Sequence, residues 1–265
     1  MRLKNNQPAI NTEWEKILRE EQRFIEKRQE KKCSLLNQKL EEKVPEKLGE
    51  TLEAAFEKAF ALVFNKGTSI IEKTYKRDEL EKTYKVQQFE AELRKSKKSL
   101  NAMKKKATQT GALNLMLSGV SGVGMGALGI GLPDIPIFIG MLLKNVYEIA
   151  LHYGFNYDTE EEKYFILLII QGANSYGEDL NEINKEINHY CQCEQLSHKC
   201  KMSERIKKAS KTLSSELIYM KFLQGIPIVG AVGGAYDVVY LQRVNEYAKL
   251  KYHYRYLFNQ RKNMK

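Results

Sequence analysis

Cysteine and proline are scarce in this chain, which has four cysteines and five prolines among its 265 residues. Three of the four cysteines are bunched between residues 191 and 200, so they cannot form the disulfide framework of a small secreted domain. We therefore expect a reducing compartment. The low proline count and the 10% of aromatic residues argue against a disordered chain. The first 30 residues lack an apolar run of the secretory type, so we also expect no signal peptide.

Strand signals are missing as well. No segment alternates apolar and polar residues for long, and no Asn-Gly or Asp-Gly pair marks a hairpin. Apolar residues recur instead at helical spacing along most of the chain. We predict an all-α fold, a multi-helix bundle around a central glycine-rich apolar helical hairpin. The predicted helices outside that hairpin are 12–44, 46–64, 68–106, one that starts at 158 or 159, 178–196, 203–224 and 235–260.

Several helix boundaries carry recognisable signals. Thr12 and Glu15 match a capping box, which predicts that the first helix starts there. Its predicted end is Val44-Pro45, since the residue before proline is biased away from helical geometry. Asp158 or Thr159, with acids after it, predicts another helix start. The continuation, Tyr164–Ile170, is apolar on every side, so we expect this helix to be buried all round.

Charge is nearly absent from one long segment of this otherwise basic chain, whose net charge is +10. Residues 107–143 contain a single acid and no basic residue, whereas residues 1–106 hold 26 Lys and Arg against 18 Asp and Glu. A group of basic residues without any acid ends just before this gap. We call them the basic collar: Arg94, Lys95, Lys97, Lys98, Lys104, Lys105 and Lys106. A basic collar beside an apolar stretch is the pattern that faces anionic lipid, although a solvated helix face beside a core segment has the same sequence.

The nearly uncharged segment, residues 111–143, has a single acid, and seven of its glycines come before Pro133. Pro133 and Pro136 divide it into two short halves, which indicates a helical hairpin rather than a single span. This hairpin could pack within the protein, dip into the membrane interface or re-enter the bilayer. A second glycine-rich segment, residues 225–235, repeats the pattern, and we predict that the two pack closely against each other. The small residues predicted to make this contact are Ser118, Gly122, Gly126, Gly230 and Gly234.

Each glycine-rich segment carries an acid near its proline, namely Asp134 and Asp237. Asp134 can simply cap the helix that starts there. If the two segments cross, the carboxylates could instead meet in a shared polar site, which makes them the candidate catalytic pair.

A cysteine and histidine cluster follows the predicted 178–196 helix. Cys191, Cys193, His198 and Cys200 offer enough donors for a tetrahedral zinc site, although they contain no Cys-x-x-Cys pair. Cys191 also continues an apolar helical series, so the alternative is one core cysteine with the others at a helix end. We keep zinc as an alternative and expect no other cofactor.

The order of these features resembles the EcsC protein family, bacterial proteins named for a gene linked to an ABC transporter. The similar pieces span about residues 40–255: Val44–Lys47, Lys66–Thr68, Gly129–Pro136, Ile149–Phe155 with Glu162, Lys163 and Leu167, and Ile226–Ala231. The resemblance implies a cytoplasmic, membrane-associated accessory to an exporter-type ABC system, with no established enzyme activity or cofactor. It divides the chain into an N-terminal amphipathic extension, 1–43, and an EcsC-like helical domain, 44–265.

Motifs for other functions are weak or missing. The chain has no Gly-x-x-x-x-Gly-Lys-Ser/Thr sequence, so it is not itself the ATPase subunit of a transporter. Its basic residues are mostly lysine and are diluted by acids, which argues against a nucleic-acid partner. We therefore predict a non-enzymatic accessory protein at the inner face of the cell membrane, with anionic lipid and ABC transporter subunits as partners. The alternative is a lipid-directed or metal-dependent enzyme that uses the carboxylate pair or the cysteine and histidine cluster.

Overall fold

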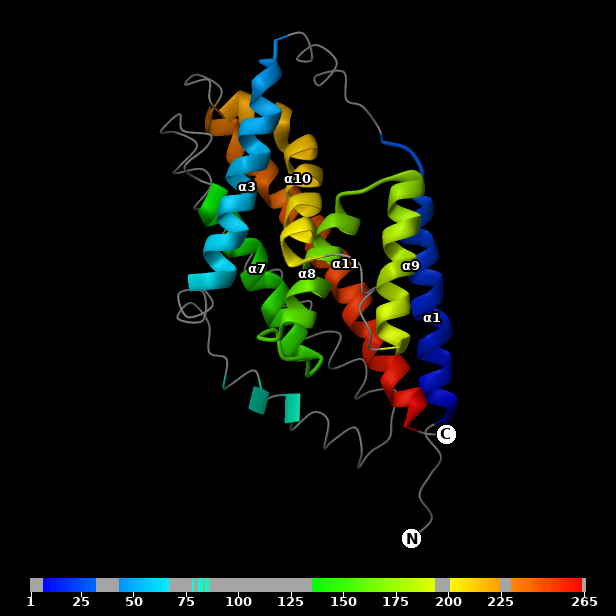
Figure 1. The fold of residues 1–265 in the computed structure, drawn as a ribbon. Coiled ribbons are helices and arrows are strands. Elements are labelled where there is room, and N and C mark those ends of the chain that lie inside the picture. Colours follow the sequence, from blue (N-terminus) through cyan, green and yellow to red (C-terminus); the bar gives the residue numbers. More distant parts are fainter. Residues whose placement is uncertain are drawn as a thin grey trace.

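A computed structural model describes residues 7–31, 43–66, 78, 81, 82, 84, 85, 135–193, 201–224 and 230–263. All the regular structure in these residues is helical, as the sequence predicts (Figure 1). The labelled helices are α1 (Gln7–Glu26), α3 (Glu46–Lys66), α7 (Ile135–His152), α8 (Glu160–Ala173), α9 (Gly177–Cys193), α10 (Met202–Gln224) and α11 (Gly230–Lys262).

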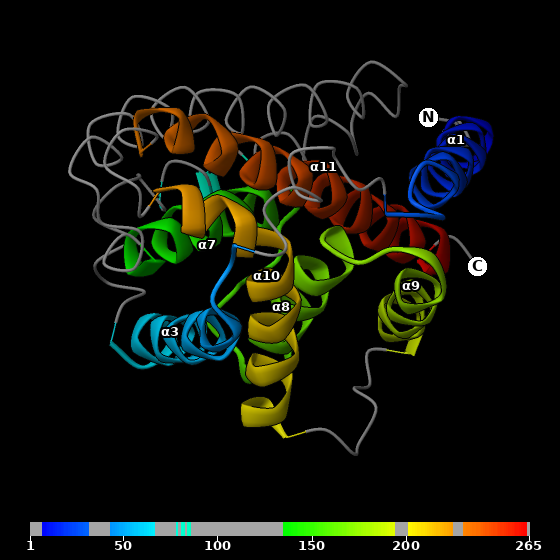
Figure 2. The same ribbon diagram turned by 90° about the horizontal axis from the view of Figure 1, so that it is seen from above.

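The long helix α11 is the centre of the described fold. It packs against α1, α7, α8, α9 and α10, while α3 packs on α7 and α10 (Figure 2). α1 and α9 lie beside the C-terminal half of α11. Close approach between α8 and α11 depends on Gly172, because a Cβ there would lie 2.7 Å from the Tyr247 ring.

Two helices follow their sequence signals closely. α3 starts at Glu46, directly after Pro45. α8 starts after Thr159, whose hydroxyl accepts a hydrogen bond from the Glu162 backbone N–H at 3.1 Å. All seven residues of Tyr164–Ile170 are buried, as predicted for a helix that is apolar on every side.

The predicted boundaries of the first helix are wrong. α1 starts at Gln7, not at Thr12, and it ends at Glu26 rather than near Val44-Pro45. Its buried stripe already includes Ile10, and Pro8 is tolerated in a first turn, so the helix extends through the capping-box sequence.

The end of α7 has a well-defined cap. Gly154 has φ +79°, and its N–H donates to the Leu151 carbonyl, while the Phe155 N–H donates to the Ala150 carbonyl, both at 3.0 Å. This pair of bonds is a Schellman motif, which favours glycine at the left-handed position. α7 is the second half of the predicted hairpin, and it packs against α3 and α11. The first half lies outside the described residues. Among the described helices, none is both long and apolar enough to cross a membrane.

Candidate functional site

A polar groove of about 650 Å³ lies between α9 and α10, and the C-terminal end of α8 forms part of its wall. α8 packs against both α9 and α10 and so brings the two helices to opposite sides of the groove. The lining residues are Lys31, Gln171, Asn174, Ser175, Tyr176, Asp179, Glu182, Ile183, Glu186, Arg205, Lys208, Lys211, Thr212, Ser215 and Glu216. They include four basic and four acidic side chains, so the formal charge of the lining is balanced.

Arg205 anchors the deep part of the groove. It is only 3% exposed, and its guanidinium donates to Glu186 at 2.9 Å, to the Tyr164 hydroxyl at 2.8 Å and to the Gln171 side chain at 2.9 Å. A buried charge of this kind is retained because it is paired and hydrogen-bonded. Burial raises the pKa of Tyr164, so its hydroxyl stays protonated at neutral pH.

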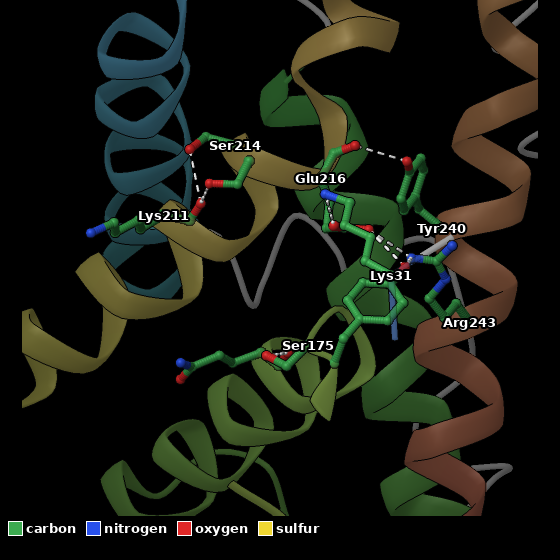
Figure 3. Close-up of polar contacts among 10 residues, drawn as sticks. Lys31, Ser175, Lys211, Ser214, Glu216, Tyr240 and Arg243 are labelled. Atoms are coloured by element: carbon green, nitrogen blue, oxygen red, sulfur yellow. Dashed lines mark hydrogen bonds and ion pairs between the residues drawn. The ribbon is translucent and has the colours of Figure 1, made fainter. Parts of the chain in front are cut away.

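Glu216 holds together the opposite end of the groove (Figure 3). Its carboxylate contacts Lys31 at 2.6 Å and Arg243 at 3.0 Å, and it accepts a hydrogen bond from the Tyr176 hydroxyl at 3.1 Å. Its backbone carbonyl accepts another from Tyr240 at 2.8 Å. The Glu216 cluster therefore joins α10, α11, the turn between α8 and α9, and the residues after α1.

Burial raises the pKa of the Tyr176 phenol, and the neighbouring Glu216 carboxylate raises it further. Tyr176 therefore remains a hydrogen-bond donor at neutral pH.

The rim of the groove carries charges that the deep part does not use. Lys208 and Lys211 are exposed on the α10 side, and Asp179 and Glu182 are exposed on the α9 side. Within the part of the chain that the structure describes, none of these four side chains makes an ion pair. One wall of the groove is thus basic and the other acidic.

A second polar cluster joins α1, α9 and α11 away from the groove. Lys251 is fully buried, and its ammonium contacts both the Glu21 carboxylate and the Asn188 side chain, the latter at 2.9 Å. Burial lowers the pKa of Lys251, and the Glu21 carboxylate opposes that shift. We call these three residues the Lys251 cluster.

Glu162 forms a further buried pair with Arg255 at 2.7 Å and accepts a hydrogen bond from Tyr252 at 2.7 Å.

The cysteine and histidine cluster is described only up to Cys193. Cys191 is buried in the core, as the alternative interpretation expects, and burial raises the pKa of its thiol to about 12. Since the thiolate is the form that binds a metal, this environment disfavours ligation by Cys191. Cys193 is exposed, with its Sγ 3.9 Å from Nδ1 of His189. The described residues contain no group of three or more potential ligands placed to hold a metal ion, and His198 and Cys200 lie outside them.

Most of the other predicted site residues lie outside the residues that the structure describes. Those not described are Asp134, Ser118, Gly122, Gly126 and the whole basic collar, Arg94, Lys95, Lys97, Lys98, Lys104, Lys105 and Lys106. Gly230, Gly234 and Asp237 fall in the first turns of α11, where the backbone is described but the Asp237 side chain is not. A meeting of Asp134 with Asp237 and the packing of the two glycine-rich segments therefore remain predictions.

The groove was missed by the sequence analysis. Its walls do leave a signal, since Asp179, Glu182 and Glu186 share one face of α9, and Lys208, Lys211 and Ser215 share one face of α10. Each pattern alone is typical of a solvated helix. Only the packing of both helices on α8 places the two faces opposite each other.

Comparison with known proteins identifies the family of this chain. The model of the EcsC protein family matches residues 9–257, which run from α1 into the last turns of α11. No curated protein and no solved structure matches the chain. The match covers most of the 265 residues and agrees with the resemblance seen in the ordered motifs. The chain therefore belongs to the EcsC protein family.

Proposed function

We propose that this protein is a membrane-associated helical accessory protein of an ABC transporter system, and that it acts by binding a lipid surface or another protein. The observation that carries the proposal is the charge step in the sequence. Seven basic residues without an acid, Arg94 to Lys106, are followed by residues 107–143 with a single acid. Such a step is typical of a segment that meets an anionic membrane at the cytoplasmic face.

The magnitude of the electrostatic attraction favours peripheral binding. Each Lys or Arg near an anionic surface contributes about 1 kcal/mol, so the basic collar is sufficient for reversible attachment. The apolar residues that follow add contact area if they reach the interface. Such attachment should weaken as salt screens the charges.

The polar groove supports a binding role over catalysis. Its deep ionisable groups are already neutralised by one another, as Arg205 is paired with Glu186 and Glu216 is paired with Lys31 and Arg243. General acid–base catalysis needs a group that is free to exchange its proton near neutral pH. Paired charges of this kind instead hold a fixed shape.

The link to an ABC transporter rests on membership of the EcsC protein family. This link implies that the protein is located at the inner face of the cell membrane. Its test is co-purification of the full chain with transporter subunits from gently solubilised native membranes. Recovery of the chain without any of these subunits would count against the link.

The membrane proposal is tested by sedimentation with vesicles that contain a third of anionic lipid. Replacing the seven collar residues by glutamine should weaken binding by at least about tenfold, and raising the salt concentration should weaken binding of the natural chain. The matched control replaces seven exposed basic residues elsewhere, namely Arg19, Arg23, Lys27, Lys47, Lys82, Lys185 and Lys262.

This control lowers the net charge by the same amount, so it should bind better than the collar variant. Equal loss in both variants, or no vesicle binding by the natural chain, would contradict the proposal.

A further inference from the structure

We infer that the groove between α9 and α10 is a binding site for a small zwitterion, a molecule with an ammonium group at one end and a phosphate or carboxylate at the other. Nothing in this inference depends on membrane attachment, because the residues that carry it all lie in the described part of the chain. The argument starts from the size of the groove. Its volume of about 650 Å³ lies within the range of roughly 300–1,000 Å³ typical of small-molecule sites.

The deep part of the groove cannot supply the charges that select a ligand. Arg205 and Glu186 are paired at 2.9 Å, and Glu216 already contacts both Lys31 and Arg243. These pairs give the groove a fixed polar wall. Recognition of a charged ligand is therefore left to the charges at the rim.

The rim charges are separated by sign. Lys208 and Lys211 stand on the α10 side and suit an anionic group. Asp179 and Glu182 stand on the α9 side and suit an ammonium group.

A purely anionic ligand would be attracted by α10 and repelled by α9, and a purely cationic ligand the reverse. Only a ligand with both charges gains from both walls.

A buried acceptor points to the same ligand. Asn174 lines the groove and is 2% exposed, and its amide nitrogen donates to the Ile170 carbonyl at 2.8 Å. Its side-chain oxygen accepts no hydrogen bond in the described structure. Buried acceptors are rarely left without a donor, and an ammonium N–H would supply one.

Two sources share this chemistry. The phosphoethanolamine headgroup of a lipid carries an ammonium and a phosphate, and a free amino acid or dipeptide carries an ammonium and a carboxylate. Both fit the charge pattern of the rim, so the experiment includes a probe for each source.

The first experiment is calorimetric titration of the full chain with phosphoethanolamine and with glycylglycine. At least one of them should bind at least about tenfold more tightly than inorganic phosphate or ethanolamine, which each carry one half of the charge pattern. Tighter binding of phosphoethanolamine indicates the lipid headgroup, and tighter binding of glycylglycine indicates an amino acid or dipeptide. Absence of binding by both zwitterions at millimolar concentration, or equal binding of phosphate alone, would overturn the inference.

Phosphocholine sharpens the assignment of Asn174, because it has the same charges as phosphoethanolamine but no N–H donor. If phosphoethanolamine is the tighter probe, phosphocholine should bind several-fold more weakly. Equal affinity would overturn the role given to the Asn174 oxygen.

The second experiment reverses the polarity of the groove. K208E/K211E and D179K/E182K should each lose at least about tenfold in affinity for the tighter zwitterion. The four substitutions together restore one basic and one acidic wall on exchanged sides. Because a small zwitterion can turn round, the combined variant should recover affinity to within about threefold of the natural chain.

A matched control for these variants is K185E/K207E, which changes two exposed lysines of α9 and α10 that do not line the groove. It should leave zwitterion affinity unchanged. All six positions of charge reversal on the rim and control surfaces are exposed, and circular dichroism checks that the helices remain. The inference would be overturned if the folded four-substitution variant failed to recover zwitterion affinity. It would also be overturned if neither double variant lost affinity.

Discussion

Two of the ion-pair clusters on α11, the Lys251 cluster and the Glu216 cluster, use the same chemistry in opposite surroundings. In the Lys251 cluster the lysine side chain is 0% exposed and the Glu21 side chain 12%, so the pair is sealed between α1, α9 and α11. In the Glu216 cluster the carboxylate is also buried, but Lys31 is 44% exposed and lines the groove. The difference teaches that burial of a carboxylate does not mark a site by itself. What distinguishes the Glu216 cluster is a partner that solvent and ligands can reach.

Removing the acid of the sealed pair should have the largest effect. Glu21→Leu leaves the buried ammonium of Lys251 without its charge partner, and breaking a buried pair costs about 3–5 kcal/mol. The free energy of unfolding in urea should fall by that amount. Glu21→Leu with Lys251→Met removes both charges and should recover much of the loss. If the single and double variants were equally unstable, the sealed pair would not differ in kind from the Glu216 cluster.

Neutralising the acid of the open cluster should cost less. Glu216→Gln removes the negative charge that Lys31 and Arg243 contact, but the Lys31 ammonium can return to water. We therefore expect the free energy of unfolding to fall by about 1–3 kcal/mol. Lys31→Ala serves as the comparison and should cost less than about 1 kcal/mol, as is usual for an exposed partner. A loss for Glu216→Gln as large as that for Glu21→Leu would show that both clusters are sealed.

Both clusters include a residue in or just after α1, and local sequence signals could not predict where this helix ends. The signals that worked were local: Pro45 before α3, the Thr159 hydroxyl at the start of α8, and the fully apolar Tyr164–Ile170. The end of α1 has no such signal. The chain turns there, and the Gly177 N–H donates to the Arg28 carbonyl at 2.9 Å, a contact between segments far apart in sequence.

The same reason explains why the groove was not predicted. Charged residues at Asp179 and Glu182 or at Lys208 and Lys211 are ordinary for exposed helix faces. They acquire meaning only because α8 holds the two helices on either side of one space. The balance of four basic and four acidic lining residues is a property of the assembled fold, and local periodicity carries no information about it.

Alkaline titration gives the smallest effect for each pH step and tests the burial of the Cys191 thiol. Burial raises the pKa of Cys191 from an ordinary value of 9.0 to about 12, and burial also raises the pKa of Tyr247 and Tyr252. A thiol whose pKa is higher in the folded state contributes stability below pH 9, and this is lost as the pH rises toward 12. Cys191 should therefore add a slope of up to about 1.4 kcal/mol per pH unit to the loss of unfolding free energy.

Cys191→Ala should reduce that slope between pH 9 and 12, while the two tyrosines keep part of it. Thr51→Ala provides the comparison, since this exposed residue of α3 carries no ionisable group and should leave the slope unchanged. An unaltered slope in Cys191→Ala would mean that the thiol ionises as readily in the folded state as in the unfolded state.

The hydrogen bond from Gly177 to Arg28 ties the N-terminal helix to the rim of the groove. Lys31 follows this turn directly and ends on Glu216, so α1 cannot detach without withdrawing a side chain from the groove lining. Fraying of α1 and opening of the Glu216 end of the groove are consequently one cooperative event. A molecule bound in the intact groove would slow the exchange of amide hydrogens along α1 with solvent deuterium, at positions that it never touches.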